Sequence, residues 1–333
     1  MDITGTPWDH LRDDFSRKYK FPFCSPKVAA SEFALESGEP APDVDSRGAE
    51  VLLMRNVCVI TGGAGGIGLA AAKIVGRDRP VVISDINQNA LDAAAAELEA
   101  AGVPCKTVVC DVTERTSTAE LVDAASEFGI VTSLIHTAGV SPSMGSPEHI
   151  VRINALGTVH VNEAFYPLAH DGFATVNVAS MAAHMFPRIL IPKRQFKTAL
   201  RDDDVFMKKM TSACNVVPAK ARPGLAYSIS KNFVTWYCAS QAARFGSRGA
   251  RILSVSPGTI DTAMGRLEEQ TGSSAIAQCG ALKRIGRPEE VAELLAFCAS
   301  DKASYITGID IPCDGGVLAV IGLKDMIAVA RVT

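Results

Sequence analysis

The sequence has little net charge and no long apolar run. Its formal charge is -3, which gives no reason to expect a nucleic acid or a membrane surface as a partner. No stretch reaches the roughly 18 uncharged apolar residues that a bilayer-spanning helix requires. The start, Met-Asp-Ile-Thr, has neither the basic residues nor the apolar segment of a secretory signal. These absences predict a soluble, cytoplasmic protein.

Patterns typical of metal sites and disulfides are also missing. The 9 cysteines show no C-x-x-C spacing and several lie in apolar runs, so we expect free thiols in a reducing compartment. The 6 histidines show no His-x-x-x-His spacing, and the sequence therefore predicts no metal site.

A glycine cluster follows the first strongly apolar run, at residues 57–68 of the 333-residue chain. Strand-forming residues, then glycines, then a helical pattern at 67–75 predict a phosphate cradle. Free N–H groups at a helix N-terminus attract anions, and glycine lets a ligand approach the backbone. The spacing fits two patterns, Gly63-x-Gly65-x-x-Gly68 and Thr61-Gly62-x-x-x-Gly66-x-Gly68.

A second apolar run, at 81–85, ends in Asp85. In a dinucleotide site such a carboxylate accepts hydrogen bonds from the adenosine ribose, and its charge repels a 2′-phosphate. The sequence therefore favours NAD over NADP. The alternative is a glycine turn beside an unrelated surface Asp85.

Strands and helices alternate from residue 51 onward. We expect strands at 57–61, 81–85, 106–110, 133–137, 173–178, 251–255 and 306–311, and helices at 67–75, 88–101, 114–128, 147–170, 226–245 and 288–298. Such alternation requires parallel strands joined by right-handed crossovers. The sequence predicts a Rossmann-like, doubly wound α/β fold at 51–333, a three-layer αβα sandwich of about seven strands with ligands at their carboxyl ends.

Residues 1–50 do not share this alternation and are predicted to form an N-terminal extension. Trp8, Leu11, Phe15 and Tyr19 recur at helical spacing, which favours a short amphipathic helix packed on the main body or on a neighbouring subunit. Two prolines and two glycines at 37–48 indicate an irregular linker.

Polar residues stand where this fold places ligands. Ser180 follows the fifth strand, and Asn154 lies amid apolar neighbours in a helix, where it needs a hydrogen-bond partner. Tyr227 and Lys231 are four residues apart on one helix face. A nearby ammonium favours phenolate, so we expect the pKa of Tyr227 to fall from about 10 toward the working pH. Tyr227 is thus a candidate general acid/base.

These residues, in this order, resemble the classical short-chain dehydrogenase/reductase family. The matching positions lie between about residues 54 and 316 and include Thr61-Gly62-x-x-x-Gly66-x-Gly68, Asp85, Asp111-Val112, Ala138-Gly139, Asn154, Ser180, Tyr227-x-x-x-Lys231 and Pro257-Gly258-x-x-x-Thr262. The resemblance implies that Tyr227 exchanges a proton with the substrate oxygen and that Ser180 donates a hydrogen bond to it. Lys231 would bind the nicotinamide ribose, and Asn154 would hold a water that links Lys231 to solvent.

The resemblance also implies a cofactor, NAD, a small alcohol or carbonyl substrate, and a homodimer or homotetramer. The implied cofactor-binding residues are Gly62, Gly65, Gly66, Ile67, Gly68, Asp85, Ile86, Asp111, Val112, Ala138, Gly139, Tyr227, Lys231, Pro257, Gly258, Ile260 and Thr262. The expected activity is interconversion of a secondary alcohol and a ketone. A sugar or acyl substrate, or nucleotide binding without turnover, are the alternatives.

Three departures from the family pattern stand out. The usual Asn-Asn-Ala-Gly is His136-Thr137-Ala138-Gly139, so the asparagine hydrogen bonds must come from elsewhere or from Thr137. The segment from Gly139 to Asn154 is short, and an insertion lies within 181–226, at about 183–223. This pairing resembles the bacterial 3α-hydroxysteroid dehydrogenase/carbonyl reductase branch, which implies a steroid-like or other bulky carbonyl substrate.

The insertion carries nine Lys or Arg residues and three Asp residues. Phe196, Leu200, Met207 and Met210 recur at near-helical spacing, so one face could cover an apolar pocket for a bulky substrate with an acidic group. A solvated helix without a substrate role is the alternative, and the insertion could also remodel a subunit interface.

Overall fold

The computed structural model describes residues 56–186, 189, 191–269 and 273–322. The predicted amphipathic helix at Trp8–Tyr19 and the linker at 37–48 lie outside these residues. Within the described part, no helix is long and apolar enough to cross a membrane.

Seven parallel strands form one sheet, in the order β3-β2-β1-β4-β5-β6-β7. The strands are β1 Asn56–Thr61, β2 Val81–Asp85, β3 Cys105–Val109, β4 Ile130–His136, β5 Ala174–Val178, β6 Arg251–Pro257 and β7 Asp310–Cys313. This confirms the predicted Rossmann-like, doubly wound fold. The strand order reverses between β1 and β4, and ligands bind at such a switch point because the flanking loops diverge there.

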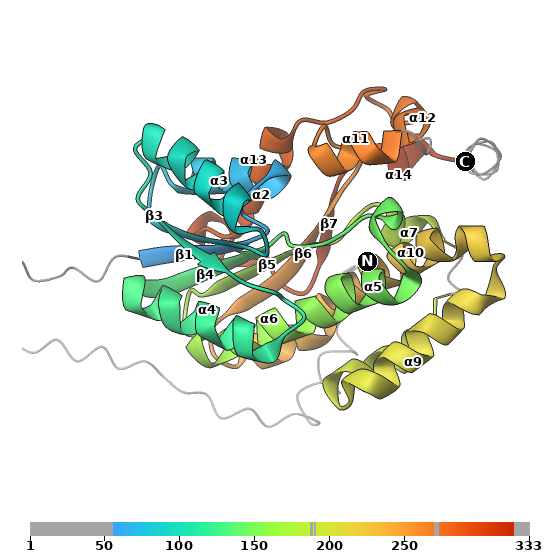
Figure 1. Ribbon diagram of the computed structural model, residues 1–333, viewed down its shortest axis with the longest axis horizontal. Coiled ribbons are helices and arrows are strands. Elements are labelled where there is room, and N and C mark those ends of the chain that lie inside the picture. Colours follow the sequence, from blue (N-terminus) through green and yellow to red (C-terminus); the bar gives the residue numbers. More distant parts are fainter. Residues whose placement is uncertain (1–55, 187–188, 190, 270–272, 323–333) are drawn as a thin grey trace, which may run out of the picture. The chain divides into compact units, whose positions relative to one another are not determined.

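Helices cover both faces of the sheet (Figure 1). On one face lie α2 Gly66–Val75, α3 Gln88–Ala100 and α13 Pro288–Cys298. On the other face lie α4 Arg115–Phe128, α5 Pro147–Val151, α6 Gly157–Phe165 and α10 Arg222–Gly246. Short helices α7 Ala182–Met185, α11 Ala263–Glu269, α12 Ser273–Gln278 and α14 Val317–Val320 follow the carboxyl ends of later strands.

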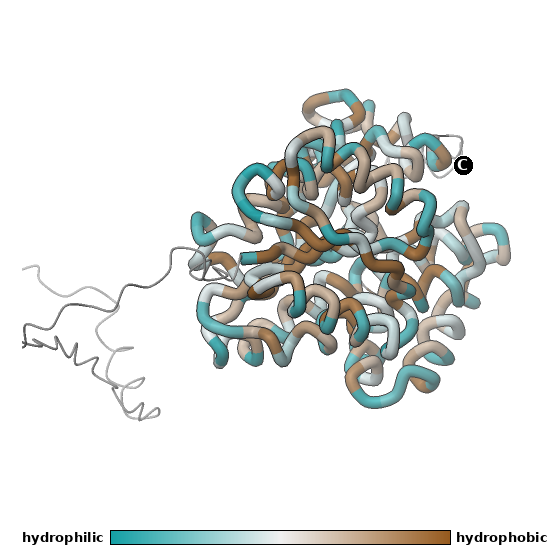
Figure 2. Tube along the Cα trace, turned by 60° about the vertical axis from the view of Figure 1, so that its left-hand side comes forward, coloured by the Kyte–Doolittle hydropathy of each residue, from teal (hydrophilic) through white to brown (hydrophobic). Residues whose placement is uncertain are grey.

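The interior strands are buried on both faces, which explains why they are rich in apolar residues, whereas the edge strands β3 and β7 are partly exposed. In β1, Val57 and Val59 pack into one apolar core, and Cys58 and Ile60 pack into the other. Figure 2 shows the hydrophobic strands inside and the hydrophilic turns of the helices outside. Burial of both strand faces therefore fixes the sheet between its two helical layers.

Two elements differ from the sequence prediction. The helix expected at 147–170 is divided into α5, a π-helical turn at Arg152–Leu156, α6 and a 3₁₀ turn at Tyr166–Leu168. The last strand, expected at 306–311, lies at Asp310–Cys313. Gly308 has a φ of 71°, and this left-handed conformation interrupts the extended backbone before β7.

The helical part of the insertion packs against α10, and residues at the two ends of the insertion line the ligand cavity. It forms α8 Lys193–Phe196, a 3₁₀ turn at Lys197–Leu200 and α9 Asp203–Ala213. The rings of Phe196 and Phe206 lie 5.3 Å and 5.0 Å from that of Phe233 on α10. Met207 and Met210 are buried, as the spacing predicts, but Leu200 is 42% exposed. The chain turns between Leu200 and α9, so Leu200 does not lie on the same helical face as Met207 and Met210.

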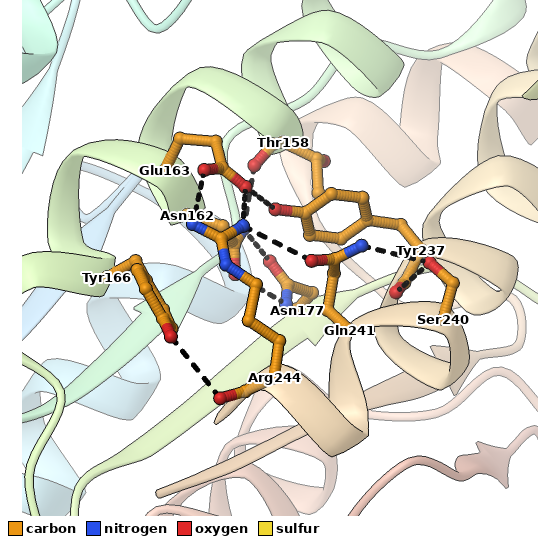
Figure 3. Close-up of polar contacts among 9 residues, drawn as sticks. All are labelled: Thr158, Asn162, Glu163, Tyr166, Asn177, Tyr237, Ser240, Gln241 and Arg244. Carbon is orange, nitrogen blue, oxygen red and sulfur yellow. Dashed lines mark hydrogen bonds and ion pairs between the residues drawn. The ribbon is translucent and has the colours of Figure 1, made fainter. Parts of the chain in front are cut away.

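A cluster of polar side chains ties α6 to α10 (Figure 3). Arg244 on α10 donates two hydrogen bonds to Glu163 on α6, at 2.6 Å and 2.8 Å. The buried Tyr237 donates its hydroxyl to the same carboxylate at 3.0 Å, and the Arg244 guanidinium stacks 3.8 Å from the centre of the Tyr166 ring. The cluster holds α10, which carries Tyr227 and Lys231, against the helix beside it.

Replacing Glu163 with alanine is expected to lower the free energy of unfolding by about 1–3 kcal/mol, because it leaves the Tyr237 hydroxyl without its acceptor and Arg244 without its carboxylate. Urea denaturation followed by circular dichroism measures this. Glu99→Ala is the matched control: Glu99 is an exposed helical glutamate without a side-chain partner in the described part of the chain. Equal effects of the two substitutions would contradict the role given to the cluster.

Candidate active site

A cavity of about 1330 Å³ opens at the carboxyl ends of the strands. It brings together all the residues that the sequence analysis assigned to cofactor binding, from Gly62 to Thr262, together with Ser180. Among the predicted site residues, Asn154 alone is not on its wall. The fold therefore gathers side chains from widely separated segments around one space.

The glycine turn between β1 and α2 leaves room for a ligand at the backbone. Gly62 and Gly66 have φ values of 66° and 52°, which L-residues with side chains rarely adopt. A Cβ on Gly68 would lie 2.1 Å from the Gly62 carbonyl oxygen, whereas one on Gly65 would meet nothing within 4 Å. The backbone conformation therefore requires glycine at the positions of the Gly62-x-x-x-Gly66-x-Gly68 pattern. At Gly65, the residue before α2, the backbone borders open space.

The helix N-terminus at this turn suits an anion. Gly65 precedes α2, and no side chain caps the first turn. Its N–H groups and the helix dipole therefore favour a phosphate at the cavity wall. The residues present fit the diphosphate of a dinucleotide.

Two carboxylates, Asp85 and Asp111, lie on the cavity wall. Asp85 ends β2, and its Oδ1 accepts a hydrogen bond from the Asn87 amide at 3.2 Å. Asp111 follows β3, and its Oδ1 accepts bonds from the amide and hydroxyl of Thr113, at 2.8 Å and 2.7 Å. Ile86, between them on the wall, is 67% exposed. This is the polar and apolar combination that an adenosine group requires.

The predicted catalytic side chains Ser180, Tyr227 and Lys231 lie close together on the same wall. The Ser180 hydroxyl lies near enough to the Tyr227 phenol to lower its pKa, and it accepts a hydrogen bond from the Ala182 amide at 3.2 Å. Lys231 is 6% exposed; its Nζ lies 5.9 Å from the centre of the Tyr227 ring and donates to the Val178 carbonyl at 3.0 Å. Two hydroxyls and an ammonium therefore surround one point on the wall.

Asn154 lies behind this wall. Its side chain forms two hydrogen bonds with the backbone of Val140, both at 2.9 Å, and a third with Ser230 at 3.3 Å. A Cβ on Gly139 would lie 2.9 Å from Asn154 Oδ1 and 3.3 Å from Lys231 Nζ. Asn154 thus fixes the loop after β4 next to Lys231, and it does so from a π-helical turn, a feature frequent at functional sites.

The pKa of Tyr227 shifts in the direction opposite to the prediction. Desolvation in the cavity wall raises it, the hydrogen bond with Ser180 partly offsets this, and the Glu268 charge raises it further. Desolvation also lowers the pKa of Lys231 to about 8. The spacing of the pair predicted their proximity, but burial disfavours both charged forms and outweighs their attraction.

Thr137 supplies hydrogen bonds at the position of the second family asparagine. Its hydroxyl donates to the Thr61 carbonyl at 2.7 Å. His136 is buried, and its Nδ1 lies 2.7 Å from the Thr61 hydroxyl. Burial, with a smaller contribution from the Lys231 charge, lowers the pKa of His136 to about 3. His136 is therefore neutral at pH 7, and His136 and Thr137 join β4 to Thr61 at the end of β1 through side-chain hydrogen bonds.

Most of the remaining cavity wall was not predicted from the sequence. It is largely apolar and is contributed by Met144, Met181, Met185, Phe186, Pro223 and Met264. Pro218, Lys220 and Ala221, which belong to the insertion as do Met185, Phe186 and Pro223, also line the cavity. Across the opening, the Glu268 carboxylate on α11 accepts hydrogen bonds from the amide and hydroxyl of Ser143. These residues come from short loops and helices, in which no periodic pattern marks the buried side.

Among the residues that the structure describes, no three His, Cys, Asp or Glu side chains cluster so that they could hold a metal ion.

Comparison with known proteins agrees with this geometry. The "short chain dehydrogenase" family model matches residues 56–191, and the "Enoyl-(Acyl carrier protein) reductase" model matches residues 206–318. A short-chain dehydrogenase/reductase of Alternaria brassicicola is 31% identical over 78% of this chain and 94% of its own length. The cis-4-hydroxycyclohexanecarboxylate dehydrogenase of Sinomonas cyclohexanicum is 32% identical over 79% of this chain and 97% of its own.

A solved structure shares the fold. A short-chain type dehydrogenase/reductase from Mycobacterium ulcerans superposes with a TM-score of 0.65 at 27% identity, over 80% of this chain and 91% of that one. The matched segments contain the glycine turn, Ser180, Tyr227 and Lys231. The chain therefore belongs to the short-chain dehydrogenase/reductase family and is an oxidoreductase.

Proposed function

We propose that the protein interconverts a secondary alcohol and a ketone with NAD(H), and that Tyr227 is its general acid/base. The observation that carries the proposal is the meeting of Tyr227, Ser180 and Lys231 in the cavity that also contains the glycine turn. A nicotinamide cofactor would be held by the turn at Gly62–Gly68, by Asp85 and Asp111, and by Lys231 near the ribose. When bound, it supplies the hydride.

In the reducing direction, negative charge develops on the substrate oxygen as the carbonyl carbon is reduced. The Ser180 hydroxyl donates a hydrogen bond to that oxygen, and the Tyr227 phenol donates its proton. Donors that are already positioned stabilise the transition state more than the ground state. The raised pKa of Tyr227 keeps the proton on the phenol at neutral pH. Lys231, fixed by the Val178 carbonyl, orients the ribose and replenishes the proton.

The substrate we propose is a bulky, apolar carbonyl compound, such as a steroid-like or other cyclic ketone. The apolar wall formed by residues such as Met181, Met185 and Phe186 supports this class, and one relative is named for the oxidation of a cyclic secondary alcohol. A sugar would find few polar partners on this wall. An acyl thioester is the second candidate, because a 3-oxoacyl-[acyl-carrier-protein] reductase of Thermotoga maritima is 30% identical over 79% of this chain.

The test is turnover by the unmodified protein, followed through NADH absorbance, with cyclic ketones, aldoses and 3-oxoacyl thioesters as separate groups of substrates. We expect turnover with cyclic ketones. Turnover restricted to thioesters would replace the first candidate by the second. Binding of NADH, measured by its fluorescence, without turnover of any group would contradict the proposal. We also propose a homodimer or homotetramer, as the family resemblance implies, which light scattering tests.

For the cofactor, Asp85→Ala is expected to raise the ratio of NADPH to NADH activity about tenfold or more, because it removes a negative charge beside the 2′-position. Steady-state kinetics with both cofactors measures the ratio. Asp123→Ala is the control: Asp123 is exposed on α4 and does not line the cavity, so it removes the same charge elsewhere. An unmodified protein that already prefers NADPH would contradict the assignment of Asp85.

A further inference from the structure

The one-turn helix α7 follows Ser180 directly and has two distinct faces. Met181, Ala182 and Met185 line the cavity. Ala183 and His184 do not line it, and their contacts lie with α10 and β7. The segment that carries Ser180 therefore forms part of the cavity wall with one face and is attached to the protein by the other.

A helix of four residues is not stable alone, because nucleation of a single turn is unfavourable. Its position therefore depends on contacts with neighbouring elements. The Met181 amide donates to the Pro257 carbonyl at 2.9 Å. The Asn232 side chain, next to Lys231 on α10, donates to the Ala183 carbonyl at 2.8 Å. His184 supplies the third attachment, since its Nε2 lies 2.7 Å from Asp310 Oδ2 on β7.

Asp310 is well suited to hold His184. Its side chain is 12% exposed, and both of its oxygens accept hydrogen bonds from β6: Oδ1 from the Ser254 hydroxyl at 2.6 Å, and Oδ2 from the Ser256 hydroxyl at 2.8 Å. A carboxylate acceptor requires the N–H on Nε2 of His184, which fixes the orientation of the imidazole. Two hydroxyls from a buried strand thus fix the carboxylate, and the carboxylate fixes His184.

We propose that His184, through Asp310, is a positioning residue that sets the place of Ser180 and of the α7 part of the cavity wall relative to Tyr227. The inference rests on the proposed function. His184 does not line the cavity and acts through the helix that carries it. Small displacements of positioning groups lower rates strongly, because reacting atoms must be aligned within about an ångström.

His184→Ala is expected to lower kcat/KM for the ketone about tenfold or more. The Kd for NADH should stay within about twofold of the unmodified protein, because the glycine turn that would hold the cofactor's diphosphate lies between β1 and α2 and not on α7. His184→Gln is expected to recover most of the activity, since its amide can donate to Asp310. His170→Ala is the matched control: His170 is exposed and precedes β5, at the other end of that strand.

A double-mutant cycle distinguishes an effect of the His184–Asp310 contact from a general loss of structure. Asp310→Asn, His184→Ala and the double variant are compared by kcat/KM, and we expect the double variant to lose no more than the more damaged single variant. The inference is overturned if His184→Ala matches His170→Ala, if NADH affinity falls by the same factor as kcat/KM, or if the two losses add. If the proposed function itself is wrong, the unmodified protein turns over no ketone, and this result differs from each of those that overturn the inference about His184.

Discussion

Replacing Tyr227 with phenylalanine is expected to lower kcat by a factor of about 10²–10⁴, while the Kd for NADH stays within about twofold. The substitution removes one oxygen atom, the proton donor, and leaves the ring that lines the cavity beside Ser180. Ser180 can still donate a hydrogen bond to the substrate oxygen, so residual activity should remain. Stopped-flow reduction of the ketone and NADH fluorescence titration measure the two quantities.

Two further variants show whether the decrease in kcat is specific to the phenol of Tyr227. Ser180→Ala is expected to lower kcat by a smaller factor, because it removes a hydrogen-bond donor but not the acid. Tyr305→Phe removes the same phenolic oxygen from a tyrosine that is fully exposed, and should leave kcat unchanged. If Tyr227→Phe keeps the activity of the unmodified protein, Tyr227 is not the general acid and the mechanism proposed above is wrong.

The sheet was predictable because its central strands are buried on both faces and are therefore rich in apolar residues. Parallel strands with right-handed crossovers then left few possible topologies. The last strand was misplaced because the left-handed conformation of Gly308 cannot be inferred from the apolar pattern of residues 306–311. The π turn at Asn154 was also missed; Asn154 bonds from this turn to Val140, and such contacts form only in the folded chain.

The location of the site was predictable because every parallel strand presents its carboxyl end to the same edge. What could not be predicted depends on burial and on contacts between distant segments. The pKa of Tyr227 was expected to fall because Lys231 is near in sequence, yet desolvation of the phenol dominates. His184 and Asp310 are 126 residues apart, and no local pattern connects them. The apolar wall contributed by Met144 and Met264 is similarly assembled from separate loops.

Replacing Lys231 with methionine is expected to abolish most of the activity and yet raise the free energy of unfolding by about 2 kcal/mol at pH 7. Burial lowers the pKa of Lys231 from 10.5 to about 8, which corresponds to about 3 kcal/mol of charge burial in the folded state. Loss of the hydrogen bond to the Val178 carbonyl offsets about 1 kcal/mol of this. Methionine fills a similar volume without a charge. Urea denaturation and NADH-dependent turnover measure the two effects.

The pH dependence of this stabilisation identifies its cause. The pKa of Lys231 is about 8 in the folded state and 10.5 when the side chain is fully hydrated, as in the unfolded chain. Between pH 8 and pH 10.5 the unfolded chain therefore binds more protons than the folded one. The free energy of unfolding of the unmodified protein consequently rises with pH through this window. The advantage of Lys231→Met should therefore be complete below pH 8 and small by pH 10.5. Lys302→Met changes an exposed lysine and should show neither effect. Two results would contradict a buried charge on Lys231: a stabilisation of Lys231→Met that persists above this pH window, or a variant less stable than the unmodified protein at pH 7. The role proposed for Lys231 beside the ribose and Tyr227 would then be wrong.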